Sequence, residues 1–162
     1  MSTMITFHVP DDKELLAAFG EMALRHEHLN YILRMTIKTL AQLTTQEALD
    51  ATTNEGSGKL RDRIRKLAQQ RLGEGQPLLK LQALMERCQR VTDKRNELVH
   101  CVWAKELDGE AQLRNADHTS RPLPTRQELS DLSNEIRNLT NALNQARLDG
   151  FLSEALAERK KK

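Results

Sequence analysis

Apolar residues recur at alternating steps of three and four along most of this chain. The longest series follows Pro10-Asp11-Asp12, a favourable helix start, and extends over about four heptads. Its members are Leu15, Phe19, Met22, His26, Leu29, Leu33, Thr36, Leu40 and Leu43. This spacing is typical of a helix that is buried along one side, so the segment from Pro10 to Leu43 is predicted to be a long helix of a bundle.

Three further segments show the same spacing. Residues 59–72 and 78–102 are separated by a stop that contains Gly and Pro, and the third segment begins at a capping box at 125–128 and ends at Gly150. A short helix is expected at 151–159. These patterns predict an all-α fold, a four- to five-helix and mainly antiparallel bundle.

The helical pattern stops at residues 103–124. The turn signal Leu107-Asp108-Gly109-Glu110 predicts a small hairpin or an irregular excursion after the third long helix. Trp103 is expected to pack against the end of that helix, with base stacking as the alternative, and His118 is expected to be an ordinary exposed loop residue. Because no repeat or long linker is present, residues 1–162 are predicted to form one domain with flexible ends at about 1–9 and 158–162.

Composition narrows the classes of function. With a net charge of +2 and 3% aromatic residues, the chain has no large basic surface and no aromatic stacking platform, so contact with nucleic acid is expected to be local. No apolar stretch of about 18 residues predicts a membrane span, and no signal peptide is recognised. Cys88 and Cys101 lack the spacing of a zinc site, so we expect reduced thiols, a cytoplasmic protein, and no metal or other cofactor.

The most informative residues lie near the end of the predicted helix 78–102. Arg95 occupies one position of a stripe whose other members are apolar: Leu81, Leu84, Cys88, Val91, Leu98 and Val102. Burial of an unpaired charge costs several kcal/mol, so Arg95 is expected to be paired or to face a cleft. On a helix, Arg95, Asn96 and His100 share a sector of roughly 140°. They provide a fixed cation, an amide and an imidazole, which are groups suited to a site that handles phosphate.

The arrangement Arg95-Asn96-x-x-x-His100, late in a long helix of a helical chain, resembles the signature of the HEPN domain family. In that signature an Arg is followed about four to six residues later by a His, and the residue directly after the Arg is often Asn. Cys101 departs from the pattern, in which Gly often follows the His, and it narrows the space beside His100.

The resemblance implies metal-independent endonucleolytic cleavage of RNA that leaves a cyclic phosphate and a 5′-hydroxyl, with Arg95, Asn96 and His100 as catalytic residues. One chain supplies one such histidine, so we expect a homodimer with these residues of both chains at the interface. The resemblance also implies a toxin or defence effector that acts beside a neutralising protein partner.

Two residues of the first helix are candidates for a supporting role. Glu27 and His26 would assist if they lie near Arg95, where a carboxylate could pair the guanidinium or orient His100. The alternative for His26 is an ordinary buried core histidine.

The segment 59–72 carries a basic face. Arg61 and Arg65 of this face, and Arg114 of the excursion, are candidates for contact with RNA phosphates, and the alternative for the face is a solvated surface. Gly56-Ser57-Gly58 has the composition of a phosphate loop. No strand precedes it and no Lys-Ser/Thr follows, so no nucleotide loop is predicted there.

Two other functions remain open at this point. One is a non-catalytic HEPN-like helical dimer that binds a nucleotide or a protein partner. The other is a purely structural helical dimer, because polar pairs at bundle interfaces also fix register without chemistry.

Overall fold

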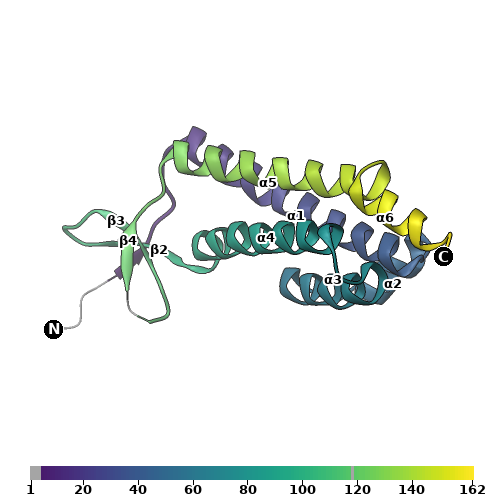
Figure 1. Cartoon of the computed structure of the whole chain (residues 1–162). Coiled ribbons are helices and arrows are strands. Elements are labelled where there is room, and N and C mark those ends of the chain that lie inside the picture. The colour runs from purple at the N-terminus through teal and green to yellow at the C-terminus, as the bar shows by residue number, and fades with distance from the viewer. Residues whose placement is uncertain (1–4, 118) are drawn as a thin grey trace.

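The computed structural model describes residues 5–117 and 119–162, so His118 lies outside the described residues. The elements in chain order are β1 (Ile5–Phe7), α1 (Lys13–Ala41), α2 (Thr45–Thr52), α3 (Ser57–Leu72), α4 (Gln76–His100), β2 (Val102–Glu106), β3 (Ala111–Arg114), β4 (Ser120–Pro122), α5 (Arg126–Leu148) and α6 (Phe151–Arg159). The fold is mainly helical, with a small sheet at one end of a helical bundle (Figure 1). The predicted helical bundle is therefore confirmed, and the region after the third long helix forms more strand than a single hairpin.

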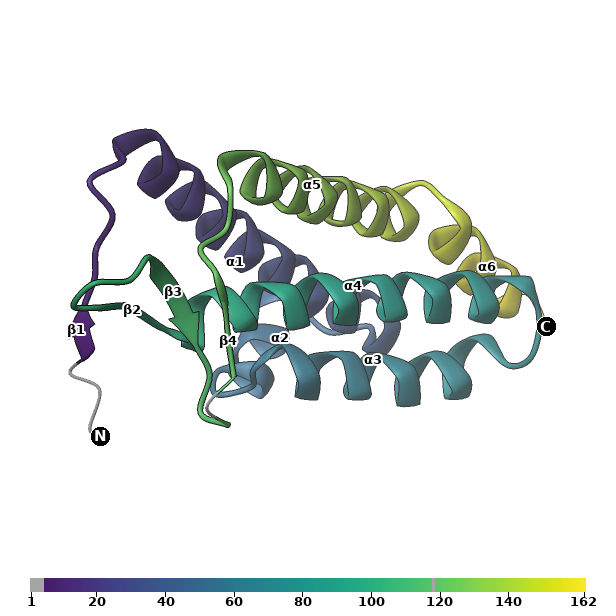
Figure 2. The same cartoon turned by 90° about the vertical axis from the view of Figure 1, so that its left-hand side faces the viewer.

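Four long helices form the bundle. α1 packs against α3 and α5, and α4 packs against the same two helices from the other side (Figures 1 and 2). Arg126, in the first turn of α5, forms ion pairs with Asp12 (Nη2 to Oδ1, 2.9 Å) and with Glu14 at the start of α1. α1 and α5 therefore begin at the same end of the bundle, whereas α4 runs in the opposite direction and ends at the sheet.

The predicted stripe of α1 forms much of the core. Its buried apolar members are Leu15, Met22, Leu29, Leu33 and Leu40, and the polar members His26 and Thr36 are buried with them. Leucine and methionine side chains of this kind each contribute about 1.5–3 kcal/mol when they leave water, so this stripe is a main source of the bundle's stability.

Local signals set the helix ends. The Asp12 carboxylate accepts from the backbone N–H of Leu15 at 3.0 Å and caps α1. Thr125 and Glu128 form the predicted capping box of α5. α3 ends at Leu72 and is followed by Gly73, whose φ of 65° suits a residue without a Cβ.

The sheet has the order β1-β2-β3-β4, and every neighbouring pair is antiparallel. The sequence did not predict β1, which pairs Phe7 with Ala104. Trp103 of β2 packs edge-to-face on Phe19 with ring centroids 5.5 Å apart, and its indole N–H donates to the backbone carbonyl of Leu98 at 3.1 Å. Trp103 thus packs the end of α4 as predicted.

Among the residues that the structure describes, no helix has both the length and the apolar character that a membrane span requires.

Candidate functional site

A cavity of 610 Å³ lies between α1, the first turn of α3 and the second half of α4. Five residues that the sequence singled out line it: His26, Glu27, Arg61, Arg95 and Asn96. Side chains three and four residues apart lie on one face of a helix, so a single helix can contribute several side chains to the cavity. Thr92, Arg95 and Asn96 of α4 are one such group.

Arg95 faces this cavity and not a sealed core. Its side chain is half-buried, and Nη1 donates to Oδ1 of Asn96 at 3.1 Å. Nε is buried and has no hydrogen-bond partner. No carboxylate of the described residues lies within the 4.0 Å of an ion pair with Arg95. The expectation that this charge would face a cleft is confirmed, and its positive charge is available to a ligand.

Arg61 is the second guanidinium of the cavity. Only 7% of the residue is exposed, and its Nε is also buried without a partner. Nη1 lies 3.5 Å from the hydroxyl oxygen of Thr92. Burial lowers the pKa of Arg61, and the nearby charge of Arg65 lowers it further. Arg61 therefore does not belong to the solvated face that was the alternative for this helix.

His26 is a core histidine that also lines the cavity. It is 1% exposed, and Nε2 is 3.1 Å from the hydroxyl oxygen of Thr92. Burial, followed by the charge of Arg95, lowers the pKa of His26 to about 4, although the Glu27 carboxylate opposes this. The imidazole is consequently neutral at pH 7. Its Nδ1 is buried without a hydrogen-bond partner and lies 4.0 Å from Oε1 of Glu27.

His100 is not among the residues that line the cavity. It is the last residue of α4 and is exposed. At about 1.5 Å of rise per residue, its Cα is roughly 6 Å along the helix axis from that of Asn96. Two of the three predicted catalytic residues therefore meet at the cavity, and the third follows one turn later on the same face of α4.

Arg65 and Arg114 lie elsewhere. Arg65 forms an ion pair with Asp62 at 3.0 Å, and Arg114 of β3 forms one with Glu106. Neither side chain lines the cavity. Their predicted contact with RNA stays a prediction that does not involve this cavity.

Asn30 and Thr92 also line the cavity and were not predicted from the sequence, whereas Lys59 lines it as a member of the predicted basic face. Thr92 had a recognisable signal, because it lies three residues before Arg95 on one helix face. Asn30 had none, because its place depends on how α3 packs against α1.

No family model, curated protein or solved structure matches this chain. What the cavity can bind therefore follows from the side chains that line it. Among the described residues, no group of three or more His, Cys, Asp or Glu side chains is arranged to hold a metal ion. Two guanidinium groups and the ammonium of Lys59 instead favour an anion with several oxygen atoms.

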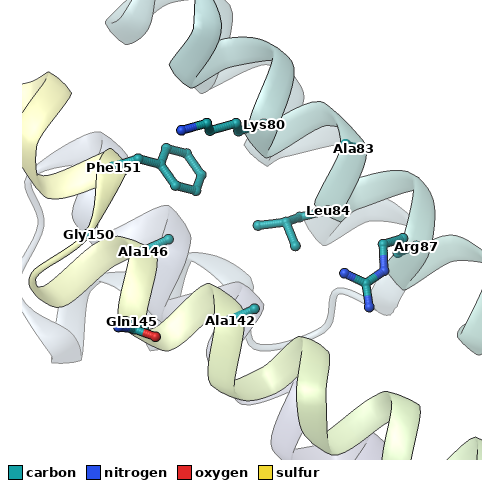
Figure 3. A pocket seen from close by; sticks show the side chains of 9 residues that line it. All are labelled: Lys80, Ala83, Leu84, Arg87, Ala142, Gln145, Ala146, Gly150 and Phe151. Carbon is teal, nitrogen blue, oxygen red and sulfur yellow. The ribbon is translucent and has the colours of Figure 1, made fainter.

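A second cavity, of 430 Å³, lies between α4, α5 and α6. Its wall is largely apolar, with Leu84 facing Ala142 and Ala146 across it (Figure 3). Lys80 Nζ lies 5.6 Å from the ring centroid of Phe151 at one edge. None of the candidate catalytic, supporting or RNA-binding residues predicted from the sequence lines this cavity.

Proposed function

We propose that this chain is a HEPN-like, metal-independent endoribonuclease that cleaves RNA at a cleft shared by two copies of the chain. One observation carries the proposal: Arg95 and Asn96 of the motif meet Arg61 in one cavity, and neither guanidinium forms an ion pair with a described carboxylate. A phosphate group suits such a site, because its oxygens accept from guanidinium donors and its charge offsets theirs.

The proposed reaction uses the 2′-hydroxyl of RNA as the nucleophile. The 2′-oxygen forms a bond to the neighbouring phosphorus while the bond from phosphorus to the 5′-oxygen breaks, which leaves a 2′,3′-cyclic phosphate and a 5′-hydroxyl. A base removes the proton of the 2′-hydroxyl, and an acid gives a proton to the leaving 5′-oxygen. Each of these steps is within the chemistry of protein side chains.

The motif residues take distinct roles in this proposal. Arg95 contacts the phosphate oxygens, whose negative charge increases in the transition state. His100 acts as base or acid, and Asn96 holds the ribose or orients His100. Glu27 and His26 support the site from α1, and His26 does so as a neutral group because its pKa is about 4.

Pairing of two chains is part of the proposal because the reaction needs both a base and an acid, and α4 carries one histidine. Exposed apolar residues near the end of α4 support such pairing. Val102 is 46% exposed, and Phe7, which pairs with Ala104 of the same strand, is 89% exposed. A second copy that covers these side chains would bring its own α4 end close to the first.

A toxin or defence effector in the cytoplasm, restrained by a neutralising protein partner, is the setting that the HEPN resemblance implies for such an enzyme. Growth of cells on induced expression tests this setting. Expression of the wild type should stop growth, and expression of Arg95→Ala should be tolerated.

A non-catalytic member of the same family, which binds a nucleotide or a protein partner, is the second candidate. One observation favours it: His100 is exposed and lies outside the cavity that holds the two guanidinium groups. A phosphate could occupy the cavity without contact to this imidazole.

Cleavage of a mixed RNA pool in excess EDTA separates the two candidates. Wild type is compared with Arg95→Ala and His100→Ala at matched dimer content, and Arg90→Ala serves as a control because Arg90 is an exposed arginine of the same helix. Loss of a general acid or base lowers a rate by about 10²–10⁴-fold, so His100→Ala should fall by at least two orders of magnitude. Arg90→Ala should retain the wild-type rate.

The products distinguish the mechanism. Fragments that end in a cyclic phosphate and begin with a 5′-hydroxyl are expected. Cleavage that persists in Arg95→Ala and His100→Ala would assign the activity to another site or to a contaminant. No cleavage by wild type at any concentration would favour the binding protein.

A further inference from the structure

The first turn of α3 opens into the cavity. α3 begins at Ser57 after Gly56, which has no side chain, and no side chain caps this helix end by a hydrogen bond. The first N–H groups of a helix have no partner within the helix, and they carry the positive end of its dipole. Gly56, Ser57, Gly58 and Lys59 all line the cavity, so this helix end faces the same space as Arg95.

A buried guanidinium lies against this turn. Arg61 is more than nine-tenths buried, and its unpartnered Nε belongs to a side chain that lines the cavity. A Cβ placed on Gly58 would lie 3.9 Å from Nη2 of Arg61, so the guanidinium lies on the side of Gly58 where a side chain would be. A buried cation without an ion-pair partner is costly unless a ligand offsets its charge. Arg61 is thus an observation independent of the helix end, and both point to an anion.

The loop before α3 is held in place without a ligand. Arg34 donates to the backbone carbonyls of Thr52 and Glu55, the latter at 3.0 Å. The Glu55 carboxylate accepts from Arg63 Nε at 3.1 Å. The hydroxyl of Ser57 donates to Oδ1 of Asn30 on α1 at 2.6 Å. Because these bonds fix the loop, the N–H groups of the first turn keep one orientation and need little ordering when an anion binds.

The charged residues that line the cavity favour the binding of an anion. Lys59, Arg61 and Arg95 are cationic, and Glu27 and Asp93 are the acidic residues of its lining. Both acidic residues are exposed, whereas Arg61 is buried and Arg95 half-buried. Water screens the exposed carboxylates more than the buried guanidinium groups, so the interior of the cavity is positive.

We propose that the first turn of α3, Arg61 and Arg95 form a phosphate-binding subsite that holds a phosphodiester group of a nucleic-acid strand. The N–H groups of Gly58 and Lys59 donate to the phosphate oxygens, and the two guanidinium groups offset the charge. The assignment to a strand rests on the proposed ribonuclease function, in which Arg95 contacts both this group and the neighbouring phosphate that is cleaved. Phosphate binding itself does not require cleavage. A terminal phosphate, as in a mononucleotide, shares this chemistry and is distinguished below.

Amide NMR of the full-length protein tests the subsite directly. ¹H–¹⁵N spectra are recorded during separate titrations with inorganic phosphate, with adenosine 5′-monophosphate, and with a 2′-O-methyl RNA trinucleotide that has no terminal phosphate and cannot be cleaved. We expect the trinucleotide to shift the amide signals of Gly58 and Lys59. These signals report on the N–H groups themselves in the wild-type protein, so the result does not depend on a variant.

Matched variants then test the guanidinium. Arg61→Gln should weaken binding of the trinucleotide about ten- to a hundredfold, because a hydrogen bond to a charged group contributes about 1.5–3 kcal/mol. Arg90→Gln removes the same charge from an exposed position of α4, outside the cavity, and should bind like wild type. Amide spectra and circular dichroism establish that Arg61→Gln is folded, and Arg95→Gln provides a second test on a less buried residue.

Three results would overturn the proposal. The first is unchanged Gly58 and Lys59 signals with all three probes. The second is equal weakening by Arg61→Gln and Arg90→Gln, which would indicate a general charge effect. The third is a shift of these signals with the mononucleotide but not with the trinucleotide, which would show that the subsite binds a terminal phosphate and not a phosphodiester group. RNA cleavage without these shifts would refute the phosphate subsite but not the ribonuclease. Shifts without cleavage would support the subsite and refute the ribonuclease.

Discussion

Acidification should destabilise this fold through His26. The pKa of His26 in the folded protein is about 4, below the ordinary 6.5, mainly because the imidazole is buried and then because of Arg95. Folding therefore favours the neutral imidazole. The stability that this contributes is fully present above pH 6.5 and is lost as the pH falls toward 4. Each pKa unit corresponds to about 1.4 kcal/mol, so the loss across this range is roughly 3 kcal/mol.

Urea unfolding of wild type and His26→Gln, at several pH values from about 7 down to 4, measures this loss. Gln at position 26 can still reach the hydroxyl of Thr92 but does not titrate. The carboxylates of Asp12 and Glu55, whose pKa values are lowered mainly by hydrogen bonds, become protonated in acid, which lowers the stability of both proteins. The contribution of these carboxylates is the same in both proteins, so the difference in free energy of unfolding between wild type and His26→Gln reports on His26.

The difference in free energy of unfolding between wild type and His26→Gln should change by roughly 3 kcal/mol over this range, to the disadvantage of wild type in acid. His28→Gln retains His26 and should keep the wild-type pH dependence, since His28 is exposed on the same helix. Parallel curves for wild type and His26→Gln would refute the reasoning. So would an imidazole NMR signal of His26 that titrates near 6.5.

Three smaller changes test other parts of the fold. Thr125→Ala removes the cap of α5 and should lower the free energy of unfolding by about 1 kcal/mol, measured in urea. Trp103→Phe keeps an aromatic ring but loses the hydrogen bond to the carbonyl of Leu98, which should cost about 1 kcal/mol by circular dichroism. Burial raises the pKa of Cys88 to about 12 and also raises that of Cys101. Alkylation near pH 8 should therefore modify Cys101 slowly and Cys88 only after unfolding, as mass spectrometry would detect.

The helices were accessible from the sequence because their signals are local. Successive members of the apolar period of α1 are three or four residues apart, and Thr125 and Glu128 of the capping box are three residues apart. Each signal corresponds to an observed feature. β1 was not accessible, because a strand of three residues has almost no period, and its partner β2 lies about a hundred residues further along the chain.

The candidate site also has one part that the sequence indicated and another part that depends on packing. Arg95 was recognised because a charge interrupts an apolar stripe, and that signal lies within one helix. Arg61 gave no such signal, because arginines and lysines surround it in the sequence and any of them could have pointed to solvent. Its burial depends on the packing of α3 against α1 and α4, where it meets Thr92. The cavity is a product of packing, which no single segment encodes.

The different environments of His26 and His100 lead to a last prediction. His26 lines the cavity but is buried and neutral, and its Nε2 is engaged with Thr92. His100 is exposed and free to approach a substrate, yet it is one residue, and cleavage requires both a base and an acid. If the second group is His100 of another copy, activity belongs to the dimer alone. Specific activity per chain should then fall on dilution in step with the dimer fraction, measured by analytical ultracentrifugation. Constant specific activity while the dimer dissociates would show that one chain suffices, and Glu27, the carboxylate nearest His26, would become the candidate for the second group.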